Sequence, residues 1–133
     1  MSPPPAATPR LVFNILISNT DDHLRNHGFL YEGQGGWRLS PAYELNPVPV
    51  DIKPRILSTA VNEDDTTASL ALAMEVAGYF ELSDPEARVF AGTVGRAVAT
   101  WRAEAAGHGL SKAAIDRMAS AFEHDDLKMA CAY

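Results

Sequence analysis

Four prolines between residues 40 and 54 constrain the fold of this 133-residue chain more than any other feature. Each proline (Pro41, Pro47, Pro49 and Pro54) lacks a backbone N–H donor and disfavours a helical conformation in the residue before it. We therefore expect residues 40–54 to lie outside helices and strands. The hydrophobic pattern differs on the two sides of this segment.

The part before the prolines predicts one helix and one hairpin. Residues 1–9 contain four prolines without apolar periodicity, which is typical of a disordered Pro-rich leader. The apolar run Leu11 to Ile17 predicts a helix, and the polar residues 18–27 predict a loop. Two short apolar runs, 28–32 and 37–39, follow and are joined by a Gly-rich turn, which predicts a β-hairpin.

The part after the prolines predicts helices. Residues 67–80 have helical periodicity, Ser83 with Glu86 forms a capping box for a helix that ends near Gly107, and Ser111 opens another helix. The side chains expected to face the core are Leu70, Ala73, Met74 and Ala77, then Phe90, Val94, Ala97, Val98 and Trp101, and finally Ile115, Met118 and Phe122.

These patterns predict a mostly helical α+β fold. The acidic run Glu123 to Asp126 is expected to be solvated, with residues 126–133 as a tail. A chain of this length can build one compact domain, whereas a two-lobed nucleotide-dependent enzyme needs about twice as much.

Charge and cysteine content exclude several classes of protein. The net charge of −6 and the lack of a basic cluster argue against direct binding of nucleic acid. The single cysteine, Cys131, cannot form an intrachain disulfide. We recognise neither a secretory signal nor a run long enough to span a membrane, so we expect no membrane association and a cytoplasmic location.

The functional side chains concentrate in the run Asn19-Thr-Asp-Asp-His-Leu-Arg-Asn26. Asp21 and Asn26 stand five residues apart, which is the spacing of the aspartate and asparagine in a protein-kinase catalytic loop. A carboxylate there accepts the proton of the substrate hydroxyl, and an amide oxygen holds Mg²⁺. Asp22 stands four residues from Asn26, so we prefer Asp21 and expect Asp22 to be solvated.

Two other interpretations of this run remain open. Asp21 and Asn26 could satisfy only local backbone groups in an Asx-rich turn. Alternatively, Asp21, His23 and His27 could hold a transition metal in a metal-dependent hydrolase. We consider His27 to be exposed, and we expect a charged run such as Glu63-Asp-Asp65 to be a solvated loop.

The sequence resembles the HipA-like serine/threonine kinases, whose C-terminal domain carries N-x-D-x-H-x-[KR]-N followed by a hairpin and P-x-Y-D. Asn19, Asp21, His23, Arg25 and Asn26 match the first motif, and Pro41-Ala-Tyr-Glu44 stands at the second. The resemblance covers roughly residues 10–125. It implies a partial kinase-like C-lobe with a hairpin after the catalytic loop and a C-terminal helical subdomain.

The resemblance also implies roles for individual residues. Asp21 would be the catalytic base, His23 a structural hydrogen-bonding group, and Arg25 a residue that steadies phosphate or the catalytic carboxylate. Asn26 and Glu44 would bind Mg²⁺ and, through it, ATP. Glu44 is one methylene longer than the aspartate of the family, which alters a ligand in a site where Mg²⁺ demands near-ideal geometry.

Partners follow from the same resemblance. The family acts in bacterial toxin–antitoxin pairs, so the implied partner is a helix-turn-helix antitoxin protein. No Gly-rich phosphate loop and no strand lysine precede the catalytic loop in this sequence, and we expect this chain alone to lack a complete ATP site. A separate N-lobe or a second copy of the chain would then cover an exposed apolar face. The alternative is a catalytically inactive kinase lobe that acts as a binding or dimerisation module.

Overall fold

The computed structural model describes residues 7–133, and it is mostly helical with one two-stranded antiparallel sheet. The N-terminal elements are helix α1 (Ala7–Leu16), the 3₁₀ turn η1 (Leu24–Asn26) and strands β1 (Phe29–Gly33) and β2 (Gly36–Leu39). The C-terminal elements are α2 (Leu70–Glu75), η2 (Ala77–Phe80), α3 (Asp84–Val98), α4 (Trp101–Gly107), α5 (Lys112–Arg117), α6 (Ala119–Phe122) and α7 (Asp125–Cys131).

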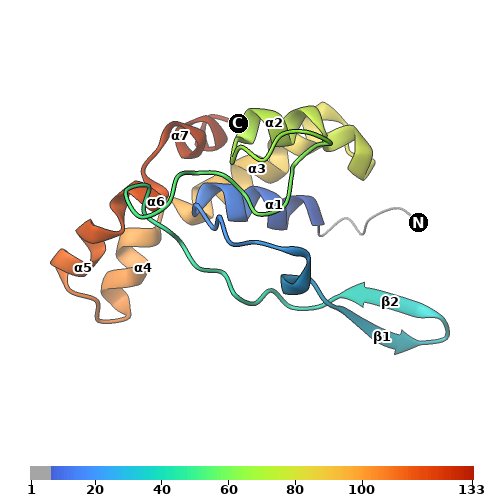
Figure 1. Cartoon of the computed structure of the whole chain (residues 1–133), viewed down its shortest axis with the longest axis horizontal. Helices are drawn as coiled ribbons and strands as arrows, with labels where there is room; N and C mark the ends of the chain where they lie inside the picture. Colours follow the sequence, from blue (N-terminus) through green and yellow to red (C-terminus); the bar gives the residue numbers. More distant parts are fainter. Residues whose placement is uncertain (1–6) are drawn as a thin grey trace.

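Helix α1 lies at the centre of the helical body, against α2, α3 and α7, and the hairpin projects away from this body (Figure 1). The main core cluster contains Val12, Leu16 and Ile17 from the N-terminal part together with Leu70, Ala91, Val98, Leu127 and Ala130. A second cluster joins Ile15 to Leu57, Ala68 and Ala73. The apolar run that follows the leader is therefore the centre of the hydrophobic core.

The predicted hairpin is confirmed. Tyr31 pairs with Trp37 across the two strands, and their ring centroids lie 5.1 Å apart. Phe29 is on the same face, and all three aromatic side chains are exposed. Residues 40–54 contain neither helix nor strand, as the prolines predicted.

Helix α3 packs through its small residues, which corrects part of the predicted inward face. Its buried residues are Ala87, Ala91, Gly92, Gly95 and Val98, whereas Phe90 and Ala97 are exposed. A Cβ atom added to Gly95 would lie 2.7 Å from the Cβ of Ala130. The two backbones approach closely because α7 lies over this row of small side chains.

Three predicted boundaries also differ from the structure. The long helix is divided near Thr100 into α3 and α4, and Trp101 stacks on Phe122 with ring centroids 4.3 Å apart. Residues 7–9 of the predicted leader belong to α1, while residues 1–6 lie outside the described part of the chain.

The expected tail is largely the helix α7, which buries Leu127 and Ala130. The prediction that Glu123 to Asp126 would be solvated is wrong for two of the four residues. His124 hydrogen-bonds the Leu16 carbonyl, and Asp126 forms an ion pair with Arg55.

The other predicted inward faces are largely confirmed. Leu70, Ala73 and Ala77 are buried in the segment predicted as the helix 67–80, and Ile115 is buried in α5. Among residues 7–133, no helix has the length and apolar character needed to cross a membrane.

Candidate active site

The predicted catalytic loop begins at Ser18, directly after α1, where the backbone turns sharply. Ser18 has a φ of 57°, in the left-handed region that residues other than glycine rarely adopt. Its hydroxyl donates to the Ala121 carbonyl (2.6 Å) and accepts from Arg55 Nε (3.1 Å). Contacts with residues distant in the sequence therefore hold the turn that directs the chain out of the core.

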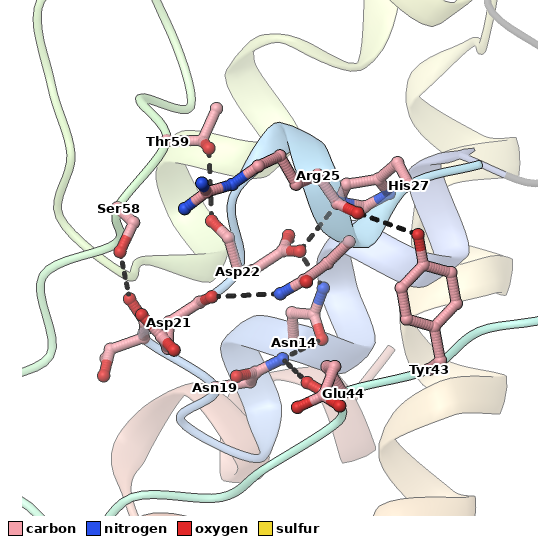
Figure 2. Close-up of polar contacts among 12 residues, drawn as sticks. Asn14, Asn19, Asp21, Asp22, Arg25, His27, Tyr43, Glu44, Ser58 and Thr59 are labelled. Carbon is pink, nitrogen blue, oxygen red and sulfur yellow. Dashed lines mark hydrogen bonds and ion pairs between the residues drawn. The ribbon is translucent and has the colours of Figure 1, made fainter.

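Three successive backbone carbonyls of the loop are bound by donors from other positions. The Thr20 carbonyl accepts from both the amide and the hydroxyl of Ser58 (3.1 and 2.9 Å). The Asp21 carbonyl accepts from Asn26 Nδ2 (3.2 Å), and the Asp22 carbonyl accepts from the Thr59 hydroxyl (3.1 Å) (Figure 2). The backbone on either side of Asp21 is thus fixed, although the loop contains only one short 3₁₀ turn.

Asp21 presents a carboxylate without a protein partner. The residue is exposed, and its carboxylate makes no hydrogen bond or ion pair with any described residue. Since the Asn26 amide nitrogen donates to the Asp21 carbonyl, the Asn26 side-chain oxygen is the atom left for another ligand. The Asp21 carboxylate and the Asn26 amide oxygen therefore come from two positions of one short loop.

The segment after the hairpin returns to this loop. The Tyr43 hydroxyl donates to the Arg25 carbonyl (2.8 Å), and Asn19 Nδ2 donates to the Glu44 carbonyl (3.3 Å). Glu44 has a φ of 56°, a left-handed conformation that is strained for a glutamate. Its carboxylate is exposed and accepts from Asn46 Nδ2 (3.3 Å). The two motifs named in the sequence are therefore joined by hydrogen bonds.

The side-chain oxygens of Asn26 and Glu44 are of the type that hard divalent cations prefer. Mg²⁺ is bound in proteins by carboxylate and amide oxygens, usually one or two of them, with waters and substrate phosphates completing the shell. The transition-metal alternative receives no support. No group of three or more His, Cys, Asp or Glu side chains that could hold a metal occurs in residues 7–133, and His27 pairs instead with Asp22.

Two predictions about side chains next to Asp21 are wrong. Asp22 is not solvated: its side chain is 14% exposed and pairs with His27 Nε2 (2.7 Å). His27, expected to be exposed, has a side chain that is 29% exposed. Asn14, on α1, also donates a hydrogen bond to Asp22 (2.9 Å), so both oxygens of this carboxylate have partners.

His23 and Arg25 lie in the loop but make few contacts. The His23 Nδ1 atom is buried without a hydrogen-bond partner in the described part of the chain, so its expected hydrogen bond is not seen there. Arg25 is exposed, and its guanidinium forms no ion pair with any residue in 7–133.

Sequence reasoning missed Asn14, Ser58 and Thr59 as parts of this site. Asn14 could have been found, because a polar residue inside an apolar helix needs a partner when it is buried. Ser58 and Thr59 carry no such signal. They lie in an irregular segment whose path depends on tertiary packing.

The chain matches the family model described as the HipA-like C-terminal domain over residues 6–121. No curated protein and no solved structure matched the chain. The matched range includes the whole loop, the hairpin and Glu44.

Proposed function

From the premise that this chain belongs to the family of HipA-like C-terminal domains, we propose that it is the catalytic-loop part of a serine/threonine protein kinase. The observation that carries the proposal is the Asp21 carboxylate, which is exposed, has no partner among residues 7–133 and lies on a backbone held on both sides. A general base needs both a fixed position and access to the substrate proton. In this proposal the fold is the C-lobe of a kinase.

The proposed reaction is transfer of the γ-phosphoryl group of ATP to a Ser or Thr hydroxyl. Asp21 orients that hydroxyl and accepts its proton as the oxygen attacks the γ-phosphorus, and the bond from this phosphorus to the bridging oxygen breaks to release ADP. Asn26 and Glu44 would hold Mg²⁺ through their side-chain oxygens. The ion would neutralise charge on the phosphates. The exposed Arg25 guanidinium serves as a contact for phosphate.

The partners in this proposal are those of the family. A separate N-lobe supplies the remainder of the nucleotide site, and a helix-turn-helix antitoxin protein controls the kinase in a bacterial toxin–antitoxin pair. The proposed location is the cytoplasm. None of these partners is needed for the geometry of Asp21 itself.

Calorimetric titration with Mg²⁺–ATP tests the proposal, with the chain alone and with any N-lobe encoded next to it. Asn26→Ala should weaken binding about tenfold or more, because it removes a metal ligand. Asp21→Asn should leave binding intact and abolish transfer to a Ser/Thr peptide. Asp125→Asn, at a fully exposed carboxylate of α7, is the matched control. No heat of binding in either sample would refute a present kinase activity.

The aromatic face of the hairpin favours a second candidate function, a binding or dimerisation module without catalysis. Phe29, Tyr31 and Trp37 are all exposed on one face of a two-stranded sheet, which is marginally stable without cover. Sedimentation of the wild type and of Trp37→Ala tests this function. A dimer that dissociates in the variant, in a protein without Mg²⁺–ATP binding, would favour the module over the kinase.

A further inference from the structure

The carboxylate of Asp22 connects three parts of the chain. One of its oxygens, Oδ2, accepts from Asn14 Nδ2 on α1 (2.9 Å). The other, Oδ1, bonds to Nε2 of His27, just before β1 (2.7 Å). Asn14 is only 1% exposed, so its amide hydrogen has no access to bulk water as an alternative acceptor.

The connection continues from Asn14 to the second motif. Asn14 Oδ1 accepts from Asn19 Nδ2 (3.0 Å), and the same nitrogen reaches the Glu44 carbonyl (3.3 Å). Figure 2 shows this path from His27 through Asp22, Asn14 and Asn19 to Glu44. The path therefore ends at the backbone of Glu44, the residue proposed to bind Mg²⁺. It also passes through Asp22, which is adjacent to the proposed base Asp21.

The chemistry of Asp22 sets the direction of every hydrogen bond along this path. An ionised carboxylate only accepts, so Asn14 must turn its nitrogen toward Asp22 and its oxygen toward Asn19. For the same reason, the hydrogen of His27 must reside on Nε2. A neutral side chain of the same shape would supply one acceptor and one donor, and it could not satisfy both neighbours as they stand.

We propose that Asp22 is a positioning residue, which ties α1, the catalytic loop and the base of the hairpin together and so fixes the position from which the Asp21 side chain extends. Among residues 7–133, no side chain contacts the Asp21 carboxylate. The position of Asp21 is therefore determined by the backbone, and that backbone is anchored directly by the side chain and the carbonyl of Asp22. The role of Asp21 as the base rests on the proposed function, whereas the contacts of Asp22 are independent of it.

Asp22→Asn, in the whole chain without added ligand, is the decisive variant, and Asp21→Asn is its matched control one residue away. Asparagine can keep its oxygen toward Asn14, which preserves the path to Glu44 and the fold. Its nitrogen then faces His27, which must move its hydrogen to Nδ1 to accept. The ¹⁵N chemical shifts of the His27 ring report this change of tautomer.

We expect Asp22→Asn to convert His27 to the Nδ1–H tautomer and to accelerate amide hydrogen exchange in residues 20–27 about tenfold, because a charge-assisted bond is lost. Asp21→Asn should change neither. If both variants accelerate exchange equally, or if Asp22→Asn leaves the tautomer and the exchange rates unchanged, the positioning role is refuted.

A kinetic measurement separates this inference from the proposed function. Where the wild type transfers phosphate, Asp22→Asn should lower kcat by up to about a hundredfold while the KM for Mg²⁺–ATP stays within about twofold, because the base is misplaced and the metal ligands are not. A rise in KM with unchanged kcat would contradict the inference. If the wild type does not bind Mg²⁺–ATP, the proposed function fails, and the tautomer and exchange measurements still decide the role of Asp22.

Discussion

Replacing Arg55 by alanine should lower the free energy of unfolding by about 3 kcal/mol or more, because it removes one partner of a largely buried ion pair. Arg55 NH1 lies 2.7 Å from Asp126 Oδ2, and the two side chains are 18% and 15% exposed. Without the guanidinium, the carboxylate keeps one hydrogen-bond partner among residues 7–133, the Leu70 amide (3.0 Å). A buried charge with a single neutral donor is strongly penalised.

The remaining contacts of Arg55 place this loss close to the proposed site. Its guanidinium also donates to the Ile15 carbonyl (2.8 Å) and to the Ser18 hydroxyl (3.1 Å), where the catalytic loop begins. A loss of about 3 kcal/mol or more is a large part of the roughly 5–15 kcal/mol that stabilises a domain. The variant should therefore unfold at a clearly lower temperature and urea concentration than the wild type.

Urea denaturation followed by circular dichroism measures this effect. The control is Arg88→Ala, which breaks an exposed pair with Asp84 on α3 and should cost no more than about 1 kcal/mol. The double variant Arg55→Ala with Asp126→Asn, compared with each single variant, should recover much of the loss because it removes the unpaired charge. The reasoning is refuted if Arg55→Ala costs no more than the control, or if the double variant is the sum of the two single variants.

Three further changes test other contacts. Gly95→Ala should destabilise the chain by about 1–3 kcal/mol in thermal denaturation, because its Cβ would lie 2.7 Å from that of Ala130. Burial, and then the charge of Arg55, lowers the pKa of His124 below 6.5, so the folded state binds fewer protons than the unfolded state and stability should fall as the pH drops from about 7 through 6.5. His124→Asn should flatten that pH dependence. Ser83→Ala should cost about 1 kcal/mol in urea denaturation, because it removes the N-cap of α3.

Local sequence pattern predicted most of the helices and the hairpin, whereas tertiary packing determined which face of a helix is buried. The hairpin and the segment 40–54 follow from turn chemistry and proline geometry, which act within a few residues. The buried face of α3 could not be predicted from such local signals. Gly92 and Gly95 carry no hydrophobic signal and are buried only because another helix approaches closely. The helical character of α7 was missed for a related reason: the acidic residues at its start favour a solvated end until Arg55 pairs with one of them.

In the candidate site, too, local sequence pattern predicted one part and tertiary packing determined the other. The spacing of Asp21 and Asn26, together with the resemblance, identified the loop, and the family match over residues 6–121 confirms the family. The roles proposed for individual residues stay predictions. Asn14 carried a signal in the sequence, as a polar residue inside an apolar helix, but its partner Asp22 could not be predicted. The donors from Ser58 and Thr59 carried none, since they come from a segment whose position is fixed only by the fold.

Asp21 and Asp22 show most clearly what the contacts add to the pattern. The two residues are adjacent and chemically identical, and spacing alone separated them by a single position. In the structure, Asp22 already accepts hydrogen bonds at both oxygens and is largely buried. Asp21 is exposed, and its carboxylate accepts no hydrogen bond from any residue in 7–133. A residue that must take a proton from a substrate needs a free, accessible oxygen, and a residue that must hold a loop needs occupied ones. Spacing and contacts are independent arguments, and both favour Asp21 as the base and leave Asp22 as its support.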